Sequence, residues 1–353
     1  MRTSIRAALV AVLALGLLAW FFRNAHLGQV WREIARADGR LLAFALATMG
    51  LNLVLRTIRW QYLLSPVGHA GFRNAFRATA IGFAASTVLP ARAGELVRPY
   101  LLARWQGFSA TAAFATIVIE RLLDTLTVVV LFSAFVLAFD PGVTVRASGI
   151  FEAVRLGAAA VGATAVVGLI VLFAAAGQPG ALARGAMRLE TVLPGRLAHV
   201  LATFVRRFAE GLAIVRAPRR LLAAVLLSVP LWLSIAAGIW AVALAFHIQM
   251  PFTGSFLLMA LLVLGVAVPT PGAVGGFHEA FRLGATAFYT APNDRAIGAA
   301  IVLHAASFLP VTALGLWFVV QDGLNLGRMR RLASLAAAEG GSDEVPVLRS
   351  SGR

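Results

Sequence analysis

The chain has 353 residues, of which 60% are hydrophobic and 13% charged, with a mean hydropathy of +0.85. A soluble domain is usually about 45–50% apolar and about 25% charged, so this composition excludes a water-soluble globular protein and indicates a polytopic membrane protein. The net charge is +16 and every basic residue is arginine. These arginines are spread between apolar runs without interleaved aromatic residues, which argues against a nucleic-acid partner. No cysteine is present, so disulfides and cysteine-based sites are excluded.

Six apolar runs are long enough to cross a bilayer, which takes about 20 residues in a helix. The predicted crossings are residues 5–22, 41–64, 111–139, 153–176, 221–246 and 296–320. The first run follows Arg2 and Arg6 and competes with a signal peptide. It has no clear small-residue cleavage site, so it is interpreted as an uncleaved first helix.

Two further apolar runs are too short for a full crossing. Residues 75–89 run into Pro90, and residues 252–268 run into Pro269 and Pro271. Each is followed by a glycine-containing turn and a second helical pattern, over residues 94–105 and 276–288. Short, Pro/Gly-interrupted segments in corresponding positions are typical of re-entrant helices. The sequence therefore predicts an all-α, polytopic membrane protein with about six full transmembrane helices and two re-entrant helical hairpins.

Loop charges predict the orientation. Residues 177–220 carry eight arginines against Glu190 and Glu210, and the tail adds Arg328, Arg330 and Arg331. Both stretches are predicted to be cytoplasmic, as is the N-terminus, in a bacterial inner membrane. The two hairpins then enter from opposite sides as an inverted pair. One loop argues against this topology, because residues 23–40 carry four arginines yet fall outside. Trp31 and Ile34 within it indicate a short interfacial helix.

We expect one transmembrane domain over residues 1–320, in which residues 177–220 form a cytoplasmic amphipathic connection. Residues 321–353 are expected to be a cytoplasmic, largely disordered tail. The end of this tail has few apolar residues, many Gly and Ser, and no periodicity.

Charged side chains within the apolar runs are candidates for function, because each costs about 2.5–3.5 kcal/mol at the bilayer centre. Arg56 and Arg59 lie near one end of the second run, so snorkelling to the headgroups explains them as well as function does. Glu120 and Asp124 share a helix face at i, i+4, and Arg121 can bridge to Asp124 at i+3. The alternative for this group is a purely structural ion pair between helices.

The first predicted hairpin turn contains Pro90, Arg92 and Gly94, followed by Glu95 and Arg98. A helix that begins near Gly94 places Glu95 in its first turn, where the helix dipole favours an acid. The alternative is a solvated interfacial loop.

The second predicted hairpin contains Pro269, Pro271, Gly272, Gly275 and Gly276, followed by Glu279 and Arg282. The glycines allow close approach of a ligand or a helix. His278 adjoins Glu279, but the pattern lacks the second histidine of a zinc protease. His304 is interpreted as a core histidine.

The embedded charges nearly balance. The arginines are Arg56, Arg59, Arg98, Arg121 and Arg282, and the acids are Glu95, Glu120, Asp124 and Glu279. The one surplus arginine leaves room for a phosphate-like anion, which arginine recognises with two parallel hydrogen bonds. We therefore expect the two hairpins to form two halves of one buried polar site.

Four motifs together resemble the flippase-like membrane domain of the lysylphosphatidylglycerol synthase family. They are LRTIRWQYLLSPVG, FAASTVLPARAGELVRPYLLAR, SATAAFATIVIERLLDTLTV and VPTPGAVGGFHEAF, and the resemblance covers roughly residues 5–320. It implies an all-helical domain with interrupted helices and a lipid-accessible cavity. The motif residues that it implies are Arg59, Arg92, Glu95, Arg98, Glu120, Arg121, Asp124, Pro271, Gly272 and Glu279. His278 stands where the family more often has arginine.

The family's full-length synthases add a soluble domain that transfers an aminoacyl group from tRNA. No such domain is expected here, so aminoacyl transfer is not attributed to the chain. The leading prediction is a lipid flippase-like protein for an amphiphile with an anionic or sugar-phosphate headgroup. A membrane-embedded lipid-carrier transferase and an accessory subunit of a polyisoprenoid or hopanoid pathway are alternatives. Membrane lipids are the expected partners. No catalytic residue, metal or cofactor is expected, and a nucleotide-binding loop is absent from the sequence.

Overall fold

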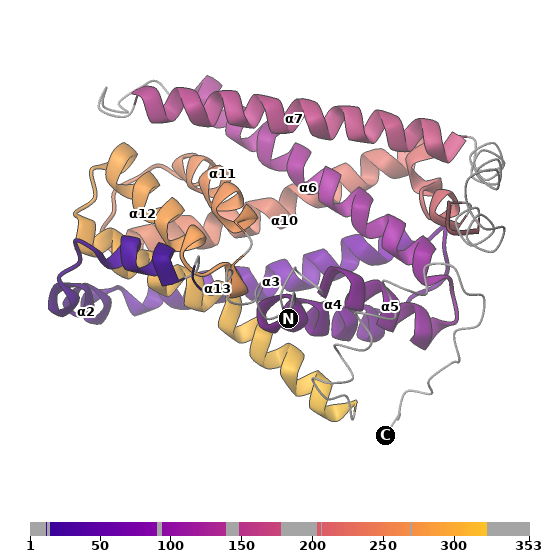
Figure 1. Ribbon diagram of the computed structural model, residues 1–353, viewed down its shortest axis with the longest axis horizontal. Helices are drawn as coiled ribbons and strands as arrows, with labels where there is room; N and C mark the ends of the chain where they lie inside the picture. The colour runs from indigo at the N-terminus through magenta and orange to yellow at the C-terminus, as the bar shows by residue number, and fades with distance from the viewer. Residues whose placement is uncertain are drawn as a thin grey trace. The chain divides into compact units, whose positions relative to one another are not determined.

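The computed structural model describes residues 12, 15–89, 94–138, 148–177, 203–205, 207–268 and 270–322, and all structural statements below concern these residues. Their regular secondary structure is helical throughout (Figure 1). The α-helices are α2 (Leu27–Arg36), α3 (Gly39–Leu64), α4 (Phe72–Val88), α5 (Gly94–Gln106), α6 (Ala110–Ala138), α7 (Ser148–Gly177), α10 (Pro218–Ala245), α11 (Gly254–Ala267), α12 (Gly276–Tyr289) and α13 (Asn293–Gln321). Two short 3₁₀ helices are η4 (Ala213–Arg216) and η5 (Pro271–Ala273).

Five of these helices have 26 to 30 residues: α3, α6, α7, α10 and α13. At a rise of about 1.5 Å per residue each is longer than the hydrocarbon core of a bilayer, which is about 30 Å thick. Helices α3, α10 and α13 are also apolar enough to cross a membrane, as predicted for residues 41–64, 221–246 and 296–320. Helices α6 and α7 coincide with two more predicted crossings, and residues 15–22 are helical within the first. That these last three cross the membrane stays a prediction.

The loop that argued against the predicted topology contains a helix. Helix α2 buries Val30, while the side chain of Trp31 is 70% exposed. Asp38 follows α2, and its Oδ1 accepts hydrogen bonds from the backbone N–H groups of Arg40 (2.8 Å) and Leu41 (3.4 Å). These bonds satisfy orphan donors in the first turn of α3, which explains why that helix begins here. The predicted short helix is therefore present, and its place at a membrane interface stays a prediction.

Both predicted hairpins consist of two short helices that pack against each other. Helices α4 and α5 lie side by side, as do α11 and α12 (Figure 1). Their lengths of 13 to 17 residues correspond to about 20–26 Å, which is less than a full crossing. The predicted bounds differ from the observed ones by at most three residues. Pro90, Arg92 and Pro269 lie outside the described residues.

Glycine allows the two helices of each hairpin to touch through their backbones. A Cβ atom on Gly94 would lie 1.8 Å from the carbonyl oxygen of Gly82 on α4. A Cβ atom on Gly276 would lie 2.3 Å from the carbonyl oxygen of Gly265 on α11. Small residues at a helix interface permit this approach, which van der Waals contacts then stabilise. The two hairpins thus share the same packing device at corresponding positions.

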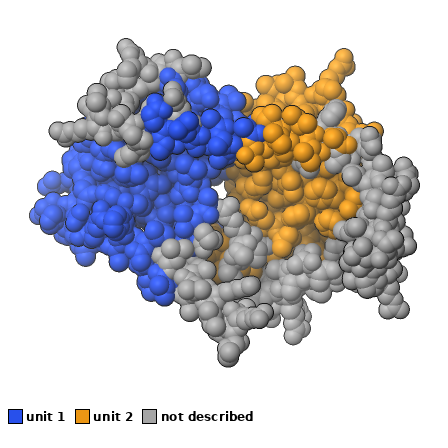
Figure 2. Space-filling model, turned by 45° about the horizontal axis from the view of Figure 1, so that its top comes forward, with its two compact units in different colours: residues 1–52, 126–163, 230–311 blue, residues 53–125, 164–229, 312–353 orange. Residues whose placement is uncertain are grey.

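The chain divides into two compact units, shown in different colours in Figure 2. Unit 1 consists of residues 1–52, 126–163 and 230–311, and unit 2 consists of residues 53–125, 164–229 and 312–353. Each of the five long helices has one end in each unit, because every boundary falls within such a helix. Hairpin α4–α5 belongs wholly to unit 2, and hairpin α11–α12 wholly to unit 1. Each long helix is therefore divided between the two units, whereas each hairpin lies in a single unit.

The glycine contacts lead to a first testable prediction. Gly94→Ala and Gly276→Ala should each destabilise the protein, because the added methyl group forces apart two backbones, and overpacking costs about 1–3 kcal/mol. Gly50→Ala is the matched control, since Gly50 is exposed within α3 and a Cβ there meets nothing within 4 Å. Thermal unfolding in detergent should show lower midpoints for the first two variants only. Equal midpoints for all three would contradict the close packing.

Candidate functional site

Two acidic side chains on α6 form the centre of a buried charge cluster in unit 2. Glu120 and Asp124 are one helical turn apart and point to the same face, as predicted. Arg56 of α3 contacts both acids through its Nη1 atom, at 3.1 Å from Glu120 Oε1 and 3.2 Å from Asp124 Oδ2. Since Arg56 is only 6% exposed, the snorkelling alternative for this residue is wrong.

Arg59 completes the contact from α3, one turn after Arg56. Its Nη1 donates to Asp124 Oδ1 at 2.7 Å and to Ser228 Oγ of α10 at 2.8 Å. The side chain is fully buried, so snorkelling is wrong for Arg59 as well. The i, i+3 spacing of the two arginines on α3 matches the i, i+4 spacing of the two acids on α6.

The hairpin contributes a third buried arginine. Arg98 lies in the second turn of α5, and its Nη1 donates to both carboxylate oxygens of Glu120, at 3.0 and 3.2 Å. Its guanidinium group lies over the ring of Trp60, 3.9 Å from the ring centroid, which is a cation–π contact. Trp60 in turn donates from Nε1 to Thr116 Oγ1 of α6 at 3.0 Å. The cluster therefore joins α3, α5, α6 and α10.

A more exposed ion pair lies at the edge of this cluster. Glu95, in the first turn of α5, lies 3.3 Å from the Nε atom of Arg121. Arg121 also reaches Asp124 at 3.5 Å, as its i+3 spacing predicted. The side chains of Arg121 and Glu95 are 39% and 33% exposed, whereas that of Glu120 is fully buried. Glu95 and Arg98 are thus both within ion-pair reach of the α6 charges, and a merely solvated loop is wrong for them.

The cluster holds more hydrogen-bond donors than acceptors. Four arginines face three carboxylates, so one positive charge is in excess. Among the residues that the structure describes, the Nε and Nη2 atoms of Arg59 and Arg98 are buried and have no hydrogen-bond partner, although Arg59 Nη2 lies 3.6 Å from Glu120 Oε1. Leaving a buried donor unpaired is costly, and an unmet donor in a native structure indicates a missing water or ligand. An anion fits both the excess charge and the free donors.

The second hairpin carries a smaller polar group in unit 1. The Nε atom of Arg282 donates to Glu279 at 2.8 Å, and its Nη1 donates to Asn293 Oδ1 of α13 at 3.0 Å. Trp20 also donates to Glu279, at 3.3 Å. The pair of Glu279 and Arg282 is internally neutral, so the surplus charge of the predicted set resides in unit 2. That both groups belong to one site stays a prediction.

The turn before α12 has the backbone that its glycines predicted. Gly272 and Gly275 have positive φ angles of 59° and 89°, a backbone conformation that residues other than glycine rarely adopt. His304 of α13 donates from Nε2 to the carbonyl oxygen of Gly272 at 2.7 Å, and His278 accepts the N–H of Gly275 at 3.3 Å. Both histidines therefore support the turn. Pro271 lies in this turn within η5.

Three contributors to the cluster were missed by the sequence interpretation. Trp60, Thr116 and Ser228 carry no charge and lie within apolar runs, so only their contacts reveal their role. Trp60 follows Arg59 directly, which was a weak signal. Ser228 lies over a hundred residues from every other member of the cluster, and no local pattern could have identified it.

With this geometry in place, comparison with known proteins identifies the family. The family described as the lysylphosphatidylglycerol synthase transmembrane region matches residues 6–315. The chain belongs to this family. The matched residues extend from before α2 to most of α13, so they include both hairpins and the whole charge cluster. The chain is thus a membrane protein with a lysylphosphatidylglycerol synthase transmembrane domain. No solved structure matches it significantly.

Three curated proteins are similar to this chain. Glycosyltransferase AglD of Haloferax volcanii is 26% identical over 334 residues, which are 86% of this chain and 52% of that protein. A UPF0104 membrane protein of Methanocaldococcus jannaschii is 31% identical over 28% of this chain and 30% of its own length. Another, of Methanothermobacter thermautotrophicus, is 28% identical over 34% and 36%. The chain therefore spans about half of the glycosyltransferase's length and about a third of each UPF0104 protein.

The burial of Glu120 leads to a second prediction. Glu120→Gln should lower the free energy of unfolding by about 3–5 kcal/mol, because it leaves Arg98 without its buried counter-charge and Arg56 with Asp124 as its remaining partner. Glu95→Gln should cost about 0–1 kcal/mol, since this pair is one-third exposed or more. The exposed Glu210→Gln serves as a control for charge removal. Thermal unfolding of the purified variants measures how much stability each one loses. An equal loss in Glu120→Gln and Glu210→Gln would contradict the buried cluster.

Proposed function

We propose that this protein binds an amphiphile with an anionic or sugar-phosphate headgroup and moves it between the two leaflets of the cytoplasmic membrane. The observation that carries the proposal is the buried surplus of arginine donors around Glu120 and Asp124. A phosphate accepts several hydrogen bonds at once and neutralises the excess charge, which the carboxylates present do not. A metal cation would instead add to the positive charge.

The exposed pair of Glu95 and Arg121 is the proposed entrance to the cluster. Its partial exposure makes it weaker than the buried pairs, so it separates at a lower cost. Separation frees Arg121 to contact an incoming headgroup while the lipid tails remain in the bilayer. Arg98 lies one turn beyond Glu95 on α5, and its free Nε and Nη2 donors receive the headgroup next. Arg59, whose side chain is fully buried, contacts the headgroup last.

The proposed membrane arrangement has about six full crossings and two re-entrant hairpins that enter from opposite sides. The division into units supports it, because each long helix contributes its predicted cytoplasmic end to unit 2 and its predicted external end to unit 1. Each hairpin remains in one unit, as a segment that enters and leaves by the same side would. In this scheme the hairpin with Glu279 and Arg282 enters from the external side, and the hairpin with Glu95 and Arg98 enters from the cytoplasmic side. Both termini are cytoplasmic in this scheme.

The absence of cysteine makes a direct test of this arrangement simple. Single cysteines at the ends of the hairpins, at Phe72 or Phe252, should react with a membrane-impermeant maleimide from opposite sides of the membrane. Phe72→Cys should be labelled only in inverted vesicles, and Phe252→Cys only in intact cells or right-side-out vesicles. Trp317→Cys, near the end of α13, is a control that should behave as Phe72→Cys does. Labelling of both hairpins from the same side would contradict the inverted pair.

A fourth prediction tests transport. In liposomes that contain the purified protein, fluorescently labelled phosphatidylglycerol should exchange between leaflets faster than in protein-free liposomes. Arg121→Gln and Glu95→Gln should each slow this exchange by about tenfold or more, because the first removes the cation that contacts the headgroup and the second removes the carboxylate that holds Arg121 at the entrance. Their thermal midpoints should stay near that of the unmodified protein. The exchange of charges, Glu95→Arg with Arg121→Glu, should restore part of the rate.

Two controls make the transport result interpretable. Glu210→Gln and Arg219→Gln remove one exposed charge each and should leave the exchange rate unchanged. The proposal fails if Glu95→Gln and Arg121→Gln keep the full rate in a protein that does translocate lipid. It also fails if the unmodified protein gives no exchange for phosphatidylglycerol or for a polyisoprenyl phosphate.

A lipid-carrier transferase is the second candidate, and the similarity to Glycosyltransferase AglD favours it. The alignment covers 52% of that protein, so its named activity comes to this chain only as a proposal. Under this candidate, the arginine cluster would hold the phosphate of a sugar-carrying lipid during transfer. Transfer of a radiolabelled sugar between lipid carriers by the purified protein, with loss of activity on chelation of divalent metal, would decide for it. Lipid exchange without any such product would decide for the flippase.

A further inference from the structure

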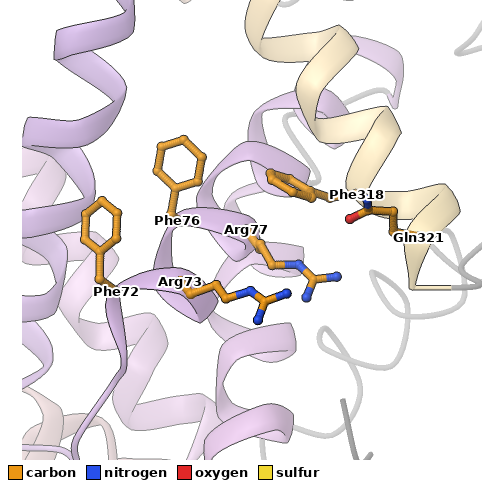
Figure 3. Close-up of a pocket in the computed structure, with 6 residues that line it drawn as sticks. All are labelled: Phe72, Arg73, Phe76, Arg77, Phe318 and Gln321. Atoms are coloured by element: carbon orange, nitrogen blue, oxygen red, sulfur yellow. The ribbon is translucent and has the colours of Figure 1, made fainter. Parts of the chain in front are cut away.

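A small pocket lies in unit 2 between the first turns of α4 and the last turn of α13 (Figure 3). Its volume is about 230 Å³, and six side chains line it: Phe72, Arg73, Phe76, Arg77, Phe318 and Gln321. None of these residues belongs to the charge cluster on α3, α5 and α6. The sequence motifs did not include them either. The pocket therefore needs an explanation of its own.

The pocket carries one net positive charge. Arg77 is paired with Asp322, the residue that follows α13, and this pair links α4 to α13. The Arg77 guanidinium also lies 5.4 Å from the ring centroid of Phe318. Arg73 is exposed and forms no salt bridge among the described residues, although its charge, like that of Arg77, acts on the Asp322 carboxylate. Arg77 is thus committed to structure, while Arg73 is available to a ligand.

The remaining wall of the pocket is aromatic. Phe72 and Phe76 are stacked with ring centroids 5.7 Å apart, and Phe76 meets Phe318 edge-on at 6.3 Å. Figure 3 shows the three rings on one side of the two arginine side chains. Phe72 is 43% exposed although it is apolar. A ligand that fits this pocket has an anionic end next to an apolar one.

The place of the pocket along α13 puts it at a membrane boundary. Helix α13 is long and apolar enough to cross a membrane, and the pocket lies at its C-terminal end. Trp317 and Val320, both beside the pocket in sequence, are 61% and 76% exposed. Exposed tryptophan near the end of a crossing is typical of the headgroup region. Phospholipid phosphates lie at this level, with their acyl chains on the apolar side.

We propose that this pocket binds the phosphate group of a membrane phospholipid through Arg73, with the first part of an acyl chain against Phe72, Phe76 and Phe318. The site is distinct from the proposed translocation site and does not depend on translocation. Asp322 opposes the anion, because its carboxylate lies beside Arg77 and offsets that charge. Removing Arg73 should therefore weaken phospholipid binding, and removing the charge of Asp322 should strengthen it.

Native mass spectrometry of the detergent-purified protein tests the proposal by counting bound dioleoyl phosphatidylglycerol during a titration. Arg73→Gln should weaken the affinity for one phosphatidylglycerol molecule about tenfold, because a charge-assisted contact to phosphate is lost. At intermediate lipid concentrations this variant should therefore carry one bound lipid fewer. Asp322→Asn should strengthen retention of that lipid. Arg219→Gln is the matched control, since it removes another exposed arginine, at the start of the candidate crossing α10, and should change nothing. Thermal midpoints identify any variant that has lost its fold.

Two further ligands distinguish the source of the phosphate. Dioleoylglycerol, which lacks phosphate, should not be retained at this site, and inorganic phosphate should not displace the phospholipid at equal concentration. Displacement by inorganic phosphate would overturn the lipid assignment. Equal losses in Arg73→Gln and Arg219→Gln, or weaker retention in a folded Asp322→Asn variant, would overturn the site. Because Arg73→Gln should leave leaflet exchange of labelled lipid unchanged, failure here is separable from failure of the proposed flippase function.

Discussion

The unit 2 site depends on the ion pairs that the carboxylates of Glu120 and Asp124 form with buried arginines. These carboxylates are buried in the middle of α6, and three arginines from α3 and α5 reach them. A buried ion pair contributes little net stability, because desolvation offsets most of the attraction. Its effect is on geometry, since any arrangement that separates these helices leaves bare charges in an apolar interior. The acids therefore hold α3 and α5 in one register against α6.

The same acids leave a site that is incomplete as a salt bridge. Among the described residues, three carboxylates cannot satisfy four guanidinium groups, and buried donors without a hydrogen-bond partner remain on Arg59 and Arg98. A cluster built for stability alone would match donors to acceptors or replace them with apolar residues. A cluster built to receive an anion needs surplus donors that are already oriented, because preorganisation lowers the cost of binding.

Glycine sets the position of the hairpins in the same way that the acids set the position of the long helices. Gly94 lets α5 approach α4 closely, and the approach brings Arg98 next to α6. Gly276 plays the corresponding role for α12 and α11. Both hairpins then present a glutamate and an arginine three residues apart, Glu95 with Arg98 and Glu279 with Arg282. In the first hairpin these residues contact different partners on α6, whereas in the second they contact each other.

The sequence was sufficient to predict the helical membrane class, the bounds of the hairpins and most residues of the charge cluster. These properties depend on local signals: apolar length, proline and glycine at breaks, and charges in apolar runs. The spacing of Glu120 and Asp124 even predicted a shared face. Sequence could not decide between snorkelling and burial for Arg56 and Arg59, because both fit a residue near the end of an apolar run. Only the packing of α3 against α6 and α10 buries them, since burial depends on neighbours distant in the chain. For the same reason, Ser228 and the pocket around Arg73 became visible only in the tertiary structure.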